Sequence, residues 1–564
     1  MKSRFTKLGT GLGAGLFLSG LLFSPIPARA DCTAMVVGKK ASRDGSVMVV
    51  HTDCCSNSRI HVVPARDWAP GEKAPVYYGI QDVRRPLHDY GEIIGYIPQV
   101  EHTYAYIHSG YPHINEHQLA IGEATILQRP ACRAIRSKGA RQIMTVEQAM
   151  LFALQRCRTA REALELITSL LEEYGFLSSC CGPDADGGEA LLIADPNEAW
   201  DLEIFGVGMD WEPGSGRPGV IWAARRIPDD HVFIMPNYPR IRKIDLSDPE
   251  NFRASSNHQQ FAVDQGWYDP DEGDPFYWQE AYTYLPSDWN LPRMWLLCQT
   301  FAPHAVHRGF DNPWSTRTAG RGMFKDSYES IRASRFTADY FPFSIRPEKK
   351  VAVQDIMAFI RSTFEGTYWD MTADRDWLVP DGKGGFVKSP LTTPFPNAHW
   401  RELLDITHHR NVSMTSAYAM ISQLRGWLPD PVGGIYWFVV DNYRHSPFIP
   451  VYCGISEISP LYNTYDPDEF QEDSARWVYD FADTLLQLQY QDAVQDLTAV
   501  RDPFEEKIFT DQAGIESEAV KTHQENPEQA AAFLTGYVRR LMEDAVQRYR
   551  DLRYTLIRKY KNRP

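Results

Sequence analysis

The order of periodic segments along the chain is the feature that most constrains its fold. Short apolar or alternating runs predict β-strands at 33–37, 46–52, 60–63, 93–100, 103–107 and 119–127. Two helical segments follow, and strand patterns return at 190–194, 199–205, 220–224 and 232–235. Strands, then helices, then further strands favour a layered α+β fold over a βαβ series, in which strands and helices alternate.

Residues with capping chemistry mark the two helices. Thr145 begins the first, with Glu147 in its first turn, and Thr159 with Glu162 has the spacing of a capping box at the start of the second. The stretch 246–347 is aromatic and proline-rich, with weak periodicity. Beyond it the pattern predicts a helix at 353–364, strands at 433–440 and 450–453, and long amphipathic helices at 475–497 and 527–560. We therefore expect a main domain at 32–468 with a helical C-terminal region, 469–564, packed on it.

The N-terminal segment has the three parts of a secretory signal peptide. Lys2, Arg4 and Lys7 precede a Gly-rich apolar run at 8–23, and Ala28-Arg29-Ala30 supplies an A-x-A cleavage pattern. A membrane anchor is the alternative, but the run is shorter than the ~20 residues that a span needs. Asp31 stands where a lipoprotein signal needs a small residue. We expect cleavage of residues 1–30 by signal peptidase and export to the periplasm or the extracellular space, with no membrane contact after processing.

Composition and missing motifs exclude several function classes. The formal net charge of −15 does not favour nucleic acid as a partner. No H-E-x-x-H, P-loop, G-x-G-x-x-G after a strand, or G-x-S-x-G motif occurs, and the nine cysteines include no C-x-x-C pair. No metal or organic cofactor is therefore predicted, and a thiol–disulfide oxidoreductase would rest on the cysteine count alone.

Cys32 is the candidate nucleophile because it stands two residues after the predicted cleavage site. If Asp31 is a one-residue pro-segment that a processing protease removes, Cys32 gains a free α-amine. An α-amine has a pKa near ~8 and can accept the thiol proton, so nucleophile and base would belong to one residue. The alternative is that Cys32 is a structural disulfide partner.

Several motifs in order along the chain resemble the N-terminal-nucleophile (Ntn) cysteine dipeptidases of the dipeptidase A type, which are related to the secernins. They are Cys32-Thr33-Ala34-Met35-Val36-Val37-Gly38-Lys39-Lys40-Ala41-Ser42-Arg43-Asp44-Gly45-Ser46, Trp222-Ala223-Ala224-Arg225-Arg226-Ile227-Pro228-Asp229-Asp230, Glu365-Gly366-Thr367 and Trp427-Leu428-Pro429-Asp430-Pro431-Val432-Gly433-Gly434. The resemblance implies an Ntn-hydrolase αββα four-layer sandwich with a helical C-terminal extension, and hydrolysis of dipeptides or short peptides.

The resemblance also implies roles for three further residues. Asp53 would contact the α-amine of Cys32, Asn115 would supply an oxyanion donor, and Asn237 would be the second asparagine of the site. Each could instead serve a turn. One departure stands out, because relatives usually carry Arg-Asn-x-Asp where this chain has Val50-His51-Thr52-Asp53. The arginine that steadies the thiol is missing there, so another arginine substitutes or the thiolate is stabilised differently.

Two other functions remain open at this stage. An amidase of the penicillin and bile-salt acylase type would share the fold and the nucleophile but act on acyl amides. A non-catalytic exported binding protein would explain the missing arginine. A homo-oligomer is compatible with these patterns.

Overall fold

The computed structural model describes residues 32–54, 57–178, 187–283, 290–304, 341–367, 369–404, 406, 412 and 415–561. The predicted signal peptide 1–30 and pro-segment Asp31 lie outside the described residues. Across these ranges, no helix combines the length and the apolar character needed to cross a bilayer.

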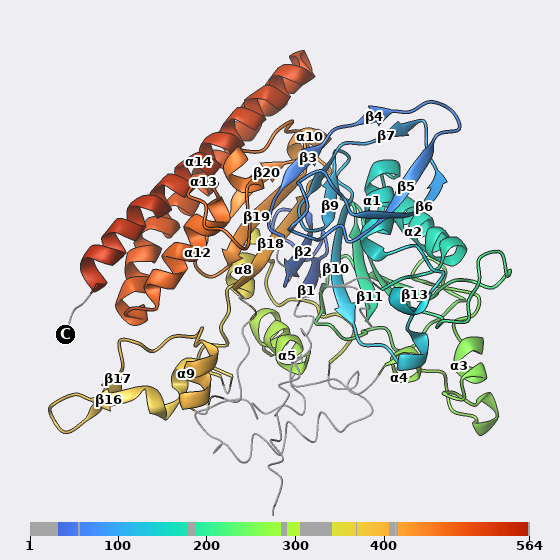
Figure 1. The fold of residues 1–564 in the computed structure, drawn as a ribbon, viewed down its shortest axis with the longest axis horizontal. Helices are drawn as coiled ribbons and strands as arrows, with labels where there is room; N and C mark the ends of the chain where they lie inside the picture. The colour runs from blue at the N-terminus through green and yellow to red at the C-terminus, as the bar shows by residue number, and fades with distance from the viewer. Residues whose placement is uncertain are drawn as a thin grey trace, which may run out of the picture.

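Two antiparallel sheets organise the chain (Figure 1). The first sheet has the order β14 (Val232–Met235), β1 (Thr33–Val37), β2 (Val47–Asp53), β18 (Thr415–Leu424), β19 (Ile435–Asn442) and β20 (Ile449–Tyr452). The second has the order β15 (Phe252–Ala254), β13 (Ile221–Ile227), β12 (Ala199–Phe205), β11 (Gly188–Ala194), β10 (Ala120–Ile126), β9 (Pro112–Asn115), β8 (Tyr106–His108) and β3 (His61–Val63). The sequence predicted most of these strands to within two residues, and the α+β class is confirmed.

The two sheets pack face to face. Strands β10 and β11 lie on β1 and β2, and the approach is close enough that a Cβ on Gly122 of β10 would come 2.9 Å from the carbonyl oxygen of Val50. The tight contact requires glycine at this position. One face of β1 and one face of β2 therefore point into the space between the sheets. Cys32 directly precedes β1, and Asp53 is the last residue of β2.

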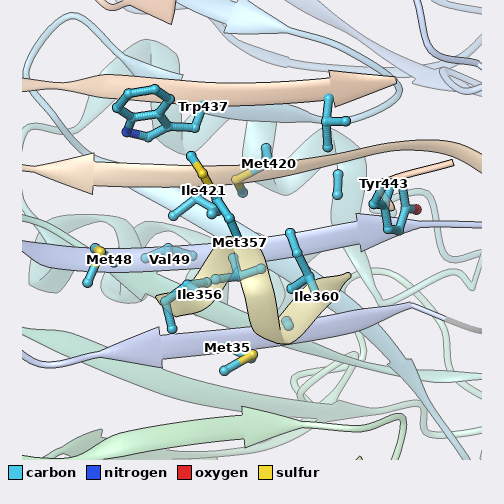
Figure 2. Close-up of a cluster of buried hydrophobic side chains, with 14 of the residues drawn as sticks. Met35, Met48, Val49, Ile356, Met357, Ile360, Met420, Ile421, Trp437 and Tyr443 are labelled. Carbon is cyan, nitrogen blue, oxygen red and sulfur yellow. The ribbon is translucent and has the colours of Figure 1, made fainter. Parts of the chain in front are cut away.

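Helices cover the outer faces of both sheets. Helices α1 (Val146–Arg156) and α2 (Ala160–Tyr174) pack on the second sheet, and Thr145 and the Thr159–Glu162 capping box start them as predicted. On the first sheet lies α8 (Val353–Ile360), whose Ile356 and Met357 meet a buried apolar cluster with Met35 and Met420 (Figure 2). Helix α5 (Asn290–Phe301) contacts β14.

The C-terminal region is helical, as predicted, but its helices are divided differently. The single helix expected at 475–497 is wrong, because α12 (Ala475–Leu486) ends and α13 (Tyr490–Glu525) begins within that span. The break lets α12 lie on β19 while α13 pairs with α14 (Pro527–Tyr560), which crosses β20. The helix expected at 353–364 also stops early, at Ile360, and Phe364 has a φ of 58° that a right-handed helix cannot include.

Smaller elements complete the described chain. Two-stranded ribbons pair β4 (Arg66–Asp67) with β7 (His102–Thr103), β5 (Lys73–Tyr78) with β6 (Glu92–Pro98), and β16 (Leu378–Pro380) with β17 (Phe386–Lys388). Short helices are α3 (Gln260–Asp264), α4 (Trp278–Tyr282), α9 (Ala398–Leu403), α10 (Asp430–Gly433) and α11 (Pro460–Asn463). The predicted division between a main domain, 32–468, and a helical region, 469–564, stays a prediction. Helix α12 of the second region packs directly on β19 of the first.

Candidate active site

Cys32 lies immediately before β1 and is buried, with 1% of its surface exposed. The register of β1 against β2 pairs Thr33 with Thr52, so the next step places Cys32 opposite Asp53. On its other side Asp53 pairs with Tyr418 of β18. The predicted nucleophile and the predicted aspartate therefore meet as cross-strand neighbours, because the hairpin at 33–53 fixes their separation along the chain.

Asp53 faces the space between the sheets. A Cβ on Gly110, in the turn between β8 and β9, would lie 2.8 Å from Asp53 Oδ2. The Tyr443 hydroxyl donates to the carbonyl oxygen of Asp53 at 3.1 Å, and the Tyr418 hydroxyl accepts from the Tyr111 backbone N–H at 3.1 Å. Asp53 is thus held in a fully buried position by both sheets.

A second cysteine, which sequence reasoning did not assign to the site, contacts Cys32. Cys54 Sγ lies 3.8 Å from Cys32 Sγ, and a carboxylate oxygen of Asp53 lies within 4.8 Å of both sulfurs. The hydrogen bond with Cys54 raises the pKa of the Cys32 thiol well above its ordinary value. Burial and the negative charges of Glu123 and Asp53 act in the same direction. With residue 31 still attached, the thiol is protonated at neutral pH and is a poor nucleophile.

Arg293 is the residue that links the site together. It lies on α5 with 1% of its surface exposed. Its Nη1 donates to the Cys32 carbonyl oxygen at 2.7 Å and to Thr33 Oγ1 at 2.9 Å. Its Nη2 donates to the carbonyl oxygen of Pro236 and to Oδ1 of Asn237, both at 2.9 Å. A guanidinium can donate to both sets of acceptors at once because its N–H groups point in different directions within one plane.

Asn237 is brought into the same network. It follows β14 with a φ of 58°, a left-handed conformation that asparagine tolerates better than most residues. Its Nδ2 donates to the carbonyl oxygen of Thr125 at 2.8 Å, so it joins the first sheet to β10 of the second. The structure therefore connects Asn237 to Cys32 through Arg293.

Asn115 is placed in a different environment. Both of its Nδ2 hydrogen bonds go to carbonyls at the C-terminal end of α1, at 2.9 Å to Leu154 and 2.8 Å to Cys157. Its Oδ1 accepts from the backbone N–H groups of His117 and Leu119. A primary amide has two N–H donors, and both are used here. In this structure the Asn115 side chain therefore joins β9 to the end of α1, and its role as an oxyanion donor stays a prediction.

His51 follows Val50, which stands at the arginine position of the Arg-Asn-x-Asp motif, and His51 supplies no positive charge. Burial lowers its pKa to about 4, so the ring is neutral at pH 7. Its Nδ1 lies 2.8 Å from the carbonyl oxygen of Glu123, and its ring packs on that of His113 with centroids 4.7 Å apart. Arg293, which comes from a distant part of the chain, contacts the carbonyl oxygen of Cys32. An arginine within the apolar run Leu291 to Leu297 is the sequence signal that could have revealed it.

Comparison with known proteins shows which family the chain resembles in sequence. The model of peptidase family C69 matches residues 31–502, which include both sheets and the start of α13. A probable dipeptidase of Salmonella dublin is 24% identical over 453 residues, covering 76% of this chain and 82% of the relative. A probable dipeptidase of Latilactobacillus sakei is 22% identical over 514 residues, covering 89% and 90%. The dipeptidase of Bifidobacterium longum (strain NCC 2705) is 23% identical over 470 residues, covering 76% and 72%. These matches confirm the resemblance that the motifs predicted.

Proposed function

The chain belongs to peptidase family C69, and from this premise we propose that it is an exported cysteine dipeptidase whose nucleophile is Cys32 at a processed N-terminus. Relatives named dipeptidases support a short peptide as the substrate. The observation that carries the cysteine mechanism is the burial of Cys32 at the start of β1, opposite Asp53, with its carbonyl bound by Arg293.

The proposed fold relationship is the Ntn-hydrolase sandwich. Two antiparallel sheets with helices on both outer faces are consistent with that fold, as is a nucleophile at the first residue of the first strand. The resemblance to the cysteine N-terminal-nucleophile amidases implies an aspartate in contact with the α-amine of the nucleophile. The register of β1 and β2 supports Asp53 in that position.

The proposed reaction begins when the α-amine of mature Cys32 accepts the thiol proton. The sulfur attacks the peptide carbonyl, and the negative charge on the oxygen is met by Asn237 and a backbone N–H. Asn237 uses one Nδ2–H for Thr125, and the second is directed to the oxyanion in this proposal. One such donor is typically worth ~3–4 kcal/mol in the transition state. The ammonium then protonates the leaving nitrogen, and water hydrolyses the thioester.

Asp53 and Arg293 act on Cys32 from two sides in this scheme. Asp53 orients the α-amine and favours its charged form during the step in which it carries a proton. Arg293 fixes the carbonyl of Cys32, so that amine and thiol keep their geometry through the cycle. Neither group needs to exchange a proton with the substrate.

Export is part of the proposal. Residues 1–30 have the pattern of a signal peptide, and the family match begins at residue 31, so the leader lies outside it. We propose that signal peptidase cuts after Ala30 and that removal of Asp31 then exposes the Cys32 amine in the periplasm or outside the cell.

The test compares the purified mature protein with Cys32→Ala and with the control Cys453→Ser. The Cys453 thiol lies 3.2 Å from the carbonyl oxygen of Gly434, a bond that a serine hydroxyl can also make. Intact mass and N-terminal sequencing should show wild type beginning at Cys32, with hydrolysis of dipeptides abolished only in Cys32→Ala.

Two outcomes contradict the proposal. A fully active wild type that still begins at Asp31 rules out the amine as base, and an active Cys32→Ala rules out the thiol as nucleophile. The same panel contains acyl amides, so faster cleavage of these than of dipeptides assigns the chain to the acylase type instead.

A further inference from the structure

The pairing of Cys54 with Cys32 is not used by the proposed mechanism, and it creates a site of its own. Three donor groups, the two thiols and the Asp53 carboxylate, have ligand atoms within 4.8 Å of one another. Cys32 and Asp53 are buried and Cys54 is half-buried, which shields the group from bulk water. From this geometry we propose that Cys32, Asp53 and Cys54 form an inhibitory binding site for a thiophilic divalent cation such as Zn²⁺.

The separation of the two sulfurs fits a tetrahedral ion. Zinc binds thiolate sulfur at about 2.3 Å. With Cys32 Sγ and Cys54 Sγ 3.8 Å apart, an ion equidistant from both makes an S–Zn–S angle of about 110°, the value of a tetrahedral site. A disulfide needs the sulfurs at about 2.0 Å, so the same pair would have to close by nearly half its present distance. In this structure both cysteines are thiols, and their separation fits a bridging ion without further movement.

The donor set selects the class of cation. Thiolates favour Zn²⁺ and similar soft or borderline ions over Mg²⁺ and Ca²⁺, which prefer oxygen ligands. Asp53 supplies a third ligand of a type found in zinc sites. Coordination releases the two thiol protons to solvent, and no electron is transferred.

Processing supplies a fourth ligand, and at this point the inference rests on the proposed function. The α-amine of mature Cys32 and its own sulfur can bind one ion together, because metal, nitrogen, Cα, Cβ and Sγ close a five-membered ring. A bound ion then occupies both the proposed nucleophile and the proposed base. The site is thus a reversible brake on the enzyme that a chelator releases.

Cobalt provides a direct readout that does not depend on activity. The mature protein is reduced, freed of metal with a chelator and titrated with Co²⁺ without oxygen. Wild type should bind one Co²⁺ per chain, with thiolate-to-cobalt charge-transfer and tetrahedral ligand-field absorption that Zn²⁺ abolishes. Loss of even an outer-shell partner weakens metal affinity about 10–100-fold. Cys54→Ser and Asp53→Asn should therefore weaken Co²⁺ binding by at least about 100-fold, while Cys453→Ser binds like wild type.

Three results overturn the metal site. Wild type that shows no charge-transfer band has no thiolate site, and Cys54→Ser that binds Co²⁺ like wild type excludes Cys54 as a ligand. A Cys32–Cys54 disulfide that reductant cannot open in the folded protein closes the site to any ion. These results are separate from the hydrolysis assay. Co²⁺ binding by wild type together with an active Cys32→Ala refutes only the nucleophile. A wild type that binds no Co²⁺ together with an inactive Cys32→Ala refutes only the metal site.

Discussion

Arg293→Lys is the substitution that most directly tests how Cys32 is positioned. Among the described residues, the guanidinium donates to Cys32 and Thr33 on one side and to Pro236 and Asn237 on the other. A lysine ammonium has three donors at one point and cannot span both pairs. About two buried acceptors should lose their partner, each at about 1–3 kcal/mol. We expect the free energy of unfolding to fall by about 2–4 kcal/mol.

The effect on activity should exceed what the loss of stability explains. A displacement of about 1 Å at a reacting group can cost about 100-fold in rate, so kcat should fall by that order while KM changes little. Urea unfolding and steady-state hydrolysis of a dipeptide, on protein whose mature N-terminus has been verified by mass, measure the two effects.

Arg425→Lys is the matched control for this experiment. Arg425 is also buried, and it donates to Glu516 and to the carbonyl oxygens of Val432 and Gly433, away from Cys32. It should lose comparable stability and keep kcat. Equal kcat in folded Arg293→Lys and Arg425→Lys would refute the view that Arg293 positions the nucleophile.

Two other substitutions test residues around the site. Asn115→Ala should lower the free energy of unfolding by about 2–4 kcal/mol, because it leaves the carbonyl oxygens of Leu154 and Cys157 without the Asn115 N–H donors. The kcat of the folded enzyme should stay at the wild-type value. A large fall in kcat would instead support Asn115 as an oxyanion donor. His51 has a folded pKa of about 4 against an ordinary 6.5, so the unfolded chain binds the proton first and stability is lost as pH falls from 6.5 toward 4. His51→Gln should remove about 3 kcal/mol of that loss, measured by urea unfolding across this range, and an unchanged slope would contradict the neutral buried ring.

The local part of the site could be predicted from the sequence because it depends on one hairpin. Strand patterns at 33–37 and 46–52, joined by the turn at 42–45, already imply that Cys32 and Asp53 approach each other. The helix starts at Thr145 and Thr159 were also predictable, since capping is a short-range interaction between a side chain and the next turn.

The contacts between segments that are distant in sequence could not be predicted in the same way. Strand β18 lies between β2 and β19, yet its sequence Thr-Ser-Ala-Tyr-Ala-Met-Ile-Ser-Gln-Leu mixes small, polar and apolar residues without clear alternation. Such a strand is buried on both faces, so the period-two signal of a half-exposed strand is absent. Arg293 was missed because its partners at Cys32 and Asn237 are remote in sequence and its own helix lies in a segment of weak periodicity.

The electrostatics of Cys32 give a physical reason to couple the proposed activation of the thiol to the proposed export. In the chain that still carries Asp31, the hydrogen bond with Cys54, burial and nearby carboxylates all raise the pKa of the thiol, which keeps it protonated. The proposed removal of Asp31 places an amine on the same residue, and once that amine has accepted the thiol proton the resulting ammonium favours the thiolate. The change supplies the base and lowers the thiol pKa together. A precursor inside the cell is therefore expected to hydrolyse no peptides, and a variant in which residue 31 cannot be removed should be exported, folded and inactive.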